Sequence, residues 1–279
     1  MKKEDIKLLI IDSIILALRE DVGQADITTD SVIPANAMIR ANITAKEGGI
    51  ICGLSIAGLV FQSVNRGIIF TPKVKDGKAV KKGTVIATVS GPARGILTAE
   101  RTALNYLQRL SGISTLTDKF VRAAGRRIKV LDTRKTTPGM RVLEKYAAKM
   151  GGGHNHRVGL FDGLLIKDNH IAVAGGLKKA VREAKKKFDA IEVETKTLAQ
   201  VGEAITEGVS RIMLDNMSVP TIKKAVQMIK RSGKKIQTEV SGGTTLKNIR
   251  RIAGTGADYV SIGALTHSAP ALDINLKVV

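Results

Sequence analysis

The sequence predicts an α/β protein with a small sheet-and-helix domain followed by a barrel of alternating strands and helices. Before residue 110, strand-like runs such as MIRANITAKE, IIFTPKV and TVIATVS alternate with turns, for example at Asp76-Gly77. A helical segment, TAERTALNYLQRLSGIS, follows from about Leu97. After residue 110, short apolar strands alternate with helices, which implies a parallel sheet with right-handed crossovers. The spacing of strand ends, roughly 20–35 residues, fits βα units that close into a barrel.

Six strands are expected in the second part of the chain, and each is a short apolar run with a polar or glycine residue at its end. They cover residues 129–133, 163–168, 190–195, 211–216, 236–241 and 259–264. Helices fit between them, notably LKKAVREAKKKF and VPTIKKAVQMIKRSG. Pro138 can occupy the first turn of another helix, and the glycines at Gly151–Gly153 would end it.

The bulk composition is that of a globular protein. The chain has 279 residues, of which 43% are hydrophobic and 25% charged, so it can bury a large core. The single cysteine, Cys52, excludes an internal disulfide framework and suits a reducing compartment, and its small apolar neighbours predict an inert buried thiol. The apolar run KLLIIDSIILAL is interrupted by Asp12 and is far shorter than the roughly 20 residues of a membrane span. We expect a buried amphipathic helix there, no membrane partner and a cytoplasmic protein.

The net charge of +20 implies a positive field that attracts anions, without specifying which. Aromatic residues make up only 3% of the chain, tryptophan is absent, and no nucleic-acid motif is recognisable. Lysines such as Lys178-Lys179 and Lys185–Lys187 fall at helical positions and are expected to be solvated. We therefore expect no nucleic-acid partner.

The ends of the six expected strands carry the chemistry. In a βα barrel these ends lie on one face, from which catalytic groups come. That face would receive three cations, two carboxylates and two glycine-containing loops: Arg134, Lys135, Lys167, Glu194, Asp215, Ser241-Gly242-Gly243 and Gly263. Glycine turns that open onto helices can present backbone N–H groups to a phosphate. The carboxylates suit ribose hydroxyls or Mg²⁺.

The number of cations indicates a polyanionic substrate or two anionic substrates. Arg157, in the HNHR loop, adds a further cation to the three at the strand ends. His154 and His156 in the same loop form a His-x-His pair, but no third nitrogen or sulfur ligand has metal-like spacing. An imidazole that donates to a carboxylate beside Arg157 is the favoured interpretation, and a structural role stays open.

Several motifs resemble those of the quinolinate phosphoribosyltransferase family. They are LREDVGQADITTDSVIP, AERTALNYLQRLSGIST, DTRKTTPGMRVLEKYAAKMGGGHNHRVGLFDGLLIKDNHI, IEVETKT, IMLDNM, EVSGG and GADYVSIGALTHS. They occur in the family's order over nearly the whole chain, and the segment from Asp132 to Ile171 is long enough to be specific.

The resemblance implies a fold and a reaction. The fold would be an N-terminal α/β sandwich (residues 1–108), an incomplete, six- or seven-stranded TIM-like barrel (109–265) and a tail (266–279) that packs back on the first domain. The reaction would transfer a phosphoribosyl group from phosphoribosyl pyrophosphate to quinolinate, with loss of carbon dioxide. Mg²⁺ would be required and no organic cofactor. The active site would be shared within a homodimer.

Carried over residue by residue, the resemblance assigns quinolinate to Thr133, Arg134, His156, Arg157 and Lys167, with Arg101 supplied by the partner chain. Phosphoribosyl pyrophosphate and Mg²⁺ would be bound by Lys135, Lys167, Glu194 and Asp215, which are also the expected catalytic residues. The 5′-phosphate would lie against Ser241, Gly242, Gly243 and Gly263. Two alternatives remain: a related phosphoribosyltransferase for another aromatic acid such as nicotinate, and a nucleic-acid-binding module.

Overall fold

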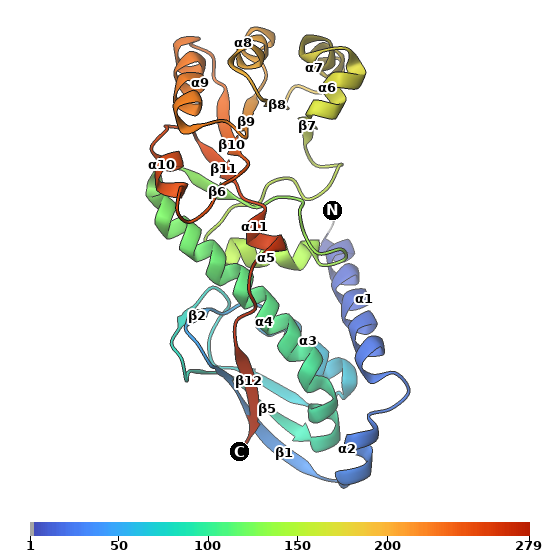
Figure 1. Ribbon diagram of the computed structural model, residues 1–279. Coiled ribbons are helices and arrows are strands. Elements are labelled where there is room, and N and C mark those ends of the chain that lie inside the picture. Colours follow the sequence, from blue (N-terminus) through green and yellow to red (C-terminus); the bar gives the residue numbers. More distant parts are fainter. Residues whose placement is uncertain (1–2) are drawn as a thin grey trace. The chain divides into compact units, whose positions relative to one another are not determined.

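The computed structural model describes residues 3–279 and divides the chain into two compact units (Figure 1). The N-terminal unit contains the chain up to Asp118 together with Thr136–Gly152 and Ala264–Val279. The barrel unit contains Lys119–Lys135 and Gly153–Gly263. The boundary expected after residue 108 lies inside one continuous helix, α4 (Ala93–Ala124). Residues 109–118 and 136–152, expected in the barrel, therefore belong to the N-terminal unit.

The N-terminal unit is built on an antiparallel sheet with the strand order β12-β1-β5-β3. Its strands are β1 (Met38–Ala45), β3 (Ile69–Pro72), β5 (Val85–Pro92) and β12 (Ile274–Val278). A two-stranded sheet joins β2 (Gly49–Ile50) to β4 (Ala79–Val80). Beside α4, the helices are α1 (Lys3–Val22), α2 (Ile27–Val32), α3 (Leu54–Val64), α5 (Arg141–Met150) and α11 (Ala264–His267). Because β12 pairs with β1, the C-terminal tail is part of this unit.

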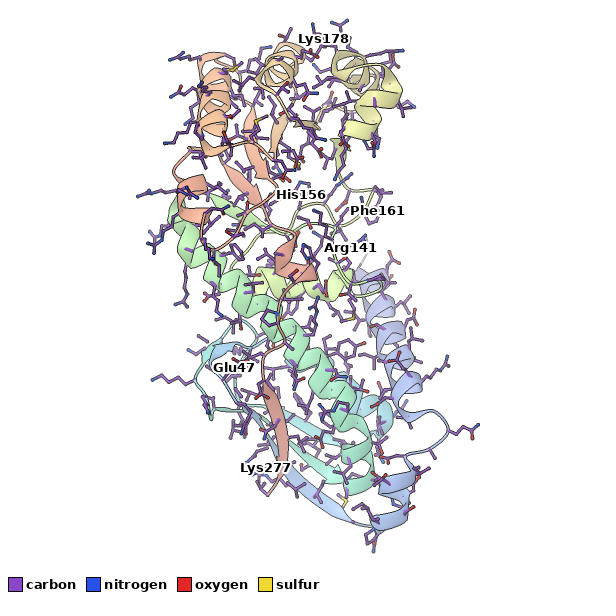
Figure 2. The ribbon with its side chains drawn as sticks, viewed as in Figure 1. Glu47, Arg141, His156, Phe161, Lys178 and Lys277 are labelled. Atoms are coloured by element: carbon purple, nitrogen blue, oxygen red, sulfur yellow. The ribbon has the colours of Figure 1, made fainter. Side chains whose placement is uncertain are left out.

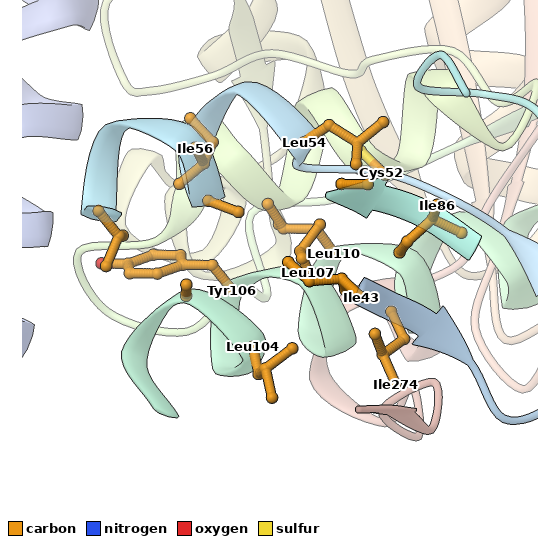
Figure 3. Packing of buried hydrophobic residues seen from close by; sticks show 14 of the residues in the cluster. Ile43, Cys52, Leu54, Ile56, Ile86, Leu104, Tyr106, Leu107, Leu110 and Ile274 are labelled. Atoms are coloured by element: carbon orange, nitrogen blue, oxygen red, sulfur yellow. The ribbon is translucent and has the colours of Figure 1, made fainter. Parts of the chain in front are cut away.

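Helices α3 and α4 cover one face of this sheet, and the core lies between these helices and the sheet (Figure 3). Ile43 of β1 and Leu107 of α4 are fully buried there. Each such side chain contributes about 1.5–3 kcal/mol when it is removed from water. Cys52 is also fully buried, and burial raises the pKa of its thiol to about 12. The prediction of an inert buried thiol is thus confirmed.

Helix α1 differs from the buried helix that its composition predicts. Ile14 is buried, whereas Leu8, Leu9 and Leu16 are 60%, 48% and 68% exposed. The prediction was wrong because the apolar residues of α1 are distributed over all faces of the helix. The N-terminal unit packs against only one of these faces. Within the described residues, no helix is long and apolar enough to span a membrane.

The barrel unit contains a six-stranded parallel sheet with the order β6-β11-β10-β9-β8-β7. The strands are β6 (Lys129–Leu131), β7 (Leu164–Ile166), β8 (Ile191–Thr195), β9 (Arg211–Asp215), β10 (Gln237–Ser241) and β11 (Tyr259–Ser261). All six expected strands are therefore present. No pairing joins β6 to β7 among the described strands, so the barrel is incomplete.

A 3₁₀ turn precedes β6 in the barrel unit, and helices follow β7, β8, β9 and β10. They are the 3₁₀ turn η1 (Gly125–Arg127) and the helices α6 (Asp168–Ala174), α7 (Leu177–Lys185), α8 (Leu198–Glu207), α9 (Val219–Arg231) and α10 (Ile249–Ala253). Helix α7 buries Leu177, Ala180 and Val181, while Lys178 and Lys179 are exposed (Figure 2). Lys185–Lys187 are exposed as well, which confirms that these lysines are solvated.

The segment before α5 corrects the expectation for Pro138. The helix begins at Arg141, three residues later, and Pro138 lies in a turn closed by the Met140 N–H to the Thr137 carbonyl (3.0 Å). Gly139 follows with φ +76°. Proline followed by a residue with positive φ is the signature of a type II turn, which competes here with a helical start.

Candidate active site

Glu194 and Asp215 lie at the carboxyl ends of the neighbouring strands β8 and β9. Glu194 pairs with Met213, so Asp215 is two residues further along its strand and points to the same face. Burial and then the negative charge of Asp215 raise the pKa of Glu194, while Lys167 partly offsets both. The fold therefore brings these three predicted site residues within electrostatic range of one another. Two close carboxylates with one of them buried favour a cation between them.

Two charged residues that sequence reasoning missed join this group. Lys196 donates to Asp168 (Nζ–Oδ2 2.7 Å), and this contact raises the pKa of the Lys196 ammonium. Glu194 and Asp215 act on Lys196 in the same direction. Asp168 is the second residue after β7, and Lys196 directly follows β8. The same strand-end argument could have found them if it had included the next residue.

The glycine loop after β10 is held close to Asp215. Gly242 and Gly243 have φ angles of +89° and +59°. A Cβ atom at Gly242 would overlap the Asn216 side chain, and the positive φ of this residue also favours glycine. Asn216 itself donates from its backbone N–H to the Ser241 carbonyl (2.9 Å) and from Nδ2 to Asp215 Oδ2 (2.8 Å). Asn216, which the sequence analysis did not select, thus links the loop to the carboxylate.

Asn248 makes further contacts with the glycine loop. Asn248 Nδ2 donates to the Gly243 carbonyl (2.8 Å), and the Thr245 N–H donates to Asn248 Oδ1 (2.8 Å). Gly263 follows β11, the next strand in the sheet. Both predicted glycine positions therefore lie at carboxyl ends of adjacent strands.

Arg134 and Arg157 of the barrel unit form a second charged group. Thr133, Arg134 and Lys135 follow β6, and Thr133 Oγ1 accepts the Lys135 N–H (3.0 Å). Burial and then the Arg134 guanidinium lower the pKa of Arg157. Arg157 Nη1 donates to the Gly163 carbonyl (3.0 Å). Two guanidinium groups within electrostatic range of each other, one of them partly desolvated, suit a ligand with carboxylate groups.

His156 lies inside the barrel unit (Figure 2). Its Nε2 atom is 3.2 Å from Glu192 Oε2 and 3.5 Å from Glu239 Oε2. Although burial lowers the pKa of His156, the two carboxylates raise it to about 9. The Arg157 backbone nitrogen lies 2.8 Å from Nδ1, which can accept its N–H only while the ring is neutral with its proton on Nε2. His154 is exposed and is not part of this cluster, so the His-x-His pair does not converge.

Arg101 belongs to the N-terminal unit and lies on an exposed position of α4. Its neighbour Glu100 has a raised pKa because it is partly buried, and Arg101 offsets this shift.

The fold and the site together define an α/β-barrel enzyme for anionic substrates. Residues 26–111 match the family of the quinolinate phosphoribosyl transferase N-terminal domain, and residues 113–277 match the C-terminal domain. A probable nicotinate-nucleotide pyrophosphorylase [carboxylating] of Bacillus subtilis is 44% identical over 93% of this chain and 90% of its own. The quinolinate phosphoribosyltransferase [decarboxylating] 1b of Nicotiana tabacum is 42% identical over 94% of this chain and 80% of its own.

A solved structure agrees with these sequence matches. The nicotinate-nucleotide pyrophosphorylase of Francisella tularensis superposes with a TM-score of 0.92 at 40% identity, over 97% of this chain and 96% of its own. The chain therefore belongs to the quinolinate phosphoribosyltransferase family.

Proposed function

We propose that the carboxyl ends of the barrel strands bind quinolinate and phosphoribosyl pyrophosphate together with Mg²⁺. The reaction is that of the family: phosphoribosyl transfer to quinolinate with decarboxylation, which gives nicotinate mononucleotide, pyrophosphate and carbon dioxide. The enzyme is thus a pentosyl transferase, a glycosyltransferase of NAD biosynthesis. The observation that carries the proposal is the arginine pair, Arg134 and Arg157, in one unit with the carboxylate pair, Glu194 and Asp215.

Quinolinate carries two neighbouring ring carboxylates, and the arginine pair matches them. Arg157 is partly desolvated beside Arg134, which makes a bound dianion more favourable than water at this position. Lys167, at the end of β7, would add a third cation, with Thr133 and His156 at the edge of the same subsite. A single carboxylate, as in nicotinate, would leave part of this charge uncompensated.

Phosphoribosyl pyrophosphate would lie along the carboxylate pair. Glu194 and Asp215 suit the ribose hydroxyls and Mg²⁺, because the buried charge of Glu194 is unfavourable without a cation. When bound, Mg²⁺ would neutralise charge on the pyrophosphate. Lys135 and Lys167 would contact the same substrate. The loop from Ser241 to Gly243 and the turn at Gly263 would hold the 5′-phosphate by backbone N–H groups.

The residue types suit the bonds that change. The pyridine nitrogen attacks C1′ of the ribose as the C1′–O bond to pyrophosphate breaks, and pyrophosphate leaves with the electron pair. Positive charge develops at the ribosyl centre, where Glu194 and Asp215 can stabilise it. The nitrogen becomes quaternary. Loss of the 2-carboxylate as carbon dioxide then leaves a carbanion that this nitrogen stabilises and that a proton quenches. No organic cofactor is required by this chemistry.

Product analysis tests the proposal. With quinolinate, phosphoribosyl pyrophosphate and Mg²⁺, we expect nicotinate mononucleotide and carbon dioxide, and no turnover when nicotinate replaces quinolinate. Lys167→Ala should lower kcat/KM by about 10- to 100-fold or more, since a hydrogen bond to a charged group contributes about 1.5–3 kcal/mol. Lys187→Ala, an exposed lysine of the same unit, is the control. Equal turnover of nicotinate would favour the alternative of a related enzyme for another aromatic acid.

A homodimer with a shared site is the second part of the proposal. The exposed leucines of α1, Leu8, Leu9 and Leu16, offer apolar surface for a partner chain. Arg101 would enter the partner's barrel site. If Arg101→Ala and Lys167→Ala chains are unfolded together and reassembled, one site of each mixed dimer regains both residues, and activity should return. Subunit exchange without recovery of activity would contradict the shared site.

The compartment is proposed on narrower grounds. The single cysteine, Cys52, is a buried free thiol, which suits a cytoplasmic enzyme. Fractionation of the native source with antibody detection would test this, and a membrane-bound or exported pool would contradict it.

A further inference from the structure

We propose that Asn216 is a positioning residue of the phosphoribosyl site: it fixes the Asp215 carboxylate relative to the glycine loop, so that the ribose and the 5′-phosphate of one substrate are bound together. This inference rests on the proposed function, which assigns Asp215 to the ribose and Ser241–Gly243 to the 5′-phosphate. Asn216 is the first residue after β9 and belongs, with both of its partners, to the barrel unit.

Asn216 contacts both parts of this site. Its backbone N–H donates to the Ser241 carbonyl (2.9 Å), and its side-chain Nδ2 donates to Asp215 Oδ2 (2.8 Å). The side chain also occupies the space that a Cβ atom at Gly242 would need. The main chain of Asn216 is therefore attached to the glycine loop, while its side chain holds the carboxylate.

The backbone conformation of Asn216 shows that the side chain has a use of its own. Its φ angle is +53°, and among the described residues it is the only non-glycine residue with a positive φ. Glycine adopts this region without steric cost, whereas asparagine tolerates it less readily. Glycine would therefore form the turn after β9 at least as well. What glycine cannot supply is the amide that donates to Asp215.

The donor that holds Asp215 is neutral. Where a cation pairs with a carboxylate, as Lys196 does with Asp168 (2.7 Å), it compensates the negative charge. The Asn216 amide instead fixes one carboxylate oxygen and leaves the charge of Asp215 in place. The carboxylate can therefore still attract Mg²⁺ or a developing ribosyl cation. Asn216 is exposed and Asp215 is half-buried, so a substrate can reach both.

The substrate requires that the two subsites keep a fixed separation. In phosphoribosyl pyrophosphate the ribose ring and the 5′-phosphate are joined through C5′, so the groups that bind them must match one distance. The sheet aligns Asp215 with Ser241, but the pairing of β9 with β10 ends at these two residues. Beyond it, the hydrogen bonds of Asn216 connect the carboxylate to the loop. Misplacement of a binding group by about 1 Å can cost roughly 100-fold in activity.

Calorimetry with nicotinate mononucleotide, which contains both the ribose and the 5′-phosphate, tests the proposal without turnover or added metal. Asn216→Gly permits the same φ, keeps the backbone N–H and removes only the side chain. We expect the mononucleotide Kd to rise about tenfold and kcat/KM for phosphoribosyl pyrophosphate to fall by about 10- to 100-fold, while the quinolinate Kd changes by less than about twofold. An unchanged mononucleotide Kd would overturn the proposal, as would a quinolinate Kd that rises equally.

A double-mutant cycle shows whether Asn216 acts through Asp215. In the Asp215→Ala background, Asn216→Gly should change the mononucleotide Kd by less than about twofold, because the acceptor of the amide is gone. Equal effects in both backgrounds would overturn the positioning role.

The control is Asn248→Ala, which removes the contact of Nδ2 with the Gly243 carbonyl (2.8 Å) on the same loop. Its effect on the mononucleotide Kd should be the same with and without the Asp215 carboxylate, since this contact lies within the loop. If the Asn248→Ala effect also disappeared in the Asp215→Ala background, any disturbance of the loop would be felt at Asp215, and the specific role of Asn216 would be refuted.

A second variant keeps the test decisive if Asn216→Gly does not fold. Asn216→Asp retains the size of the side chain and its tolerance of positive φ, but it places a carboxylate against Asp215 Oδ2. The mononucleotide Kd should then rise by at least about tenfold, because two like charges cannot share the contact. A Kd equal to that of wild type would overturn the proposal.

Failure of the proposed function and failure of the positioning role are distinguishable. A wild-type protein that neither binds the mononucleotide nor turns over quinolinate would contradict the proposed function, and the positioning role would fall with it. A wild-type protein that does both, with Asn216→Gly indistinguishable from it, would contradict the positioning role alone.

Discussion

Glu144 in the N-terminal unit and Glu239 in the barrel unit are both fully buried carboxylates paired with an arginine. Glu144 Oε1 accepts Arg109 Nη2 (2.7 Å), Arg109 Nε (3.0 Å) and the Thr137 hydroxyl (2.8 Å). Glu144 Oε2 accepts the Thr137 N–H (3.1 Å). Both oxygens are thus satisfied by groups of one unit.

Glu239 differs in that only one of its oxygens is used. Oε2 faces Arg211 and His156, whereas Oε1 has no hydrogen-bond partner among the described residues. A buried acceptor without a donor costs about 1–3 kcal/mol. A satisfied carboxylate can be retained for stability alone. A buried carboxylate with one unpaired oxygen contributes less to stability than one with both oxygens paired.

Removing the charge of Glu144, whose two oxygens are both hydrogen-bonded, should have the largest effect on stability. In Glu144→Gln an amide would face the partly buried Arg109 guanidinium, which would lose its counter-charge. The free energy of unfolding should fall by about 3–5 kcal/mol, measured by urea denaturation, with the quinolinate KM unchanged. Glu183→Gln, which breaks only an exposed pair with Lys186, is the control. If the free energy of unfolding fell by less than about 1 kcal/mol, Glu144 would be no more stabilising than a surface pair, and its contrast with Glu239 would disappear.

Glu194→Gln should reverse this pattern. Because burial raises the pKa of Glu194, its charge is unfavourable in the folded state, and the neutral amide should fold at least as well. Activity should nevertheless fall by about 100-fold or more, as when one preorganised electrostatic contact to a transition state is lost. Initial rates and thermal melts on the same samples would check both. A destabilised, active variant would show that Glu194 is structural.

His156→Gln tests the contacts of His156 with Glu192 and Glu239 by pH. The carboxylates raise the pKa of His156 to about 9, above an unfolded value of about 6.5. The stabilisation is therefore complete below pH 6.5 and is lost as pH rises through about 9. The stability gap between wild type and variant should narrow by about 1–3 kcal/mol between pH 6 and 9.5 in urea denaturation. Parallel pH curves would show a ring that is neutral throughout, held by its Nε2 proton alone.

Lys178→Ala should have the smallest effect. The side chain is exposed on α7, so the change should alter stability by less than about 0.5 kcal/mol and leave kcat/KM unchanged. Thermal melts and initial rates suffice. A larger loss of activity would mean that the basic outer helices contribute to substrate binding. Neither the Glu144 nor the Glu239 contacts would explain that result.

The sequence by itself determined the strands of the barrel and the position of Lys167, Glu194 and Asp215 at their ends. This was accessible because apolar runs and polar ends are local, and because parallel strands bring all their carboxyl ends to one edge. The roles of the site residues stay predictions, since geometry alone does not show a substrate.

Tertiary structure alone decided which inward-facing residues meet. Glu192 and Glu239 look like ordinary strand residues in IEVET and QTEVS, and they meet His156 only because β8, β9 and β10 align in register. The exposure of α1, the turn at Pro138 and the continuity of α4 were likewise decided by what each segment packs against. The periodicity of apolar residues predicts which face of a helix or strand is apolar. Which other element packs against that face depends on residues distant in the chain.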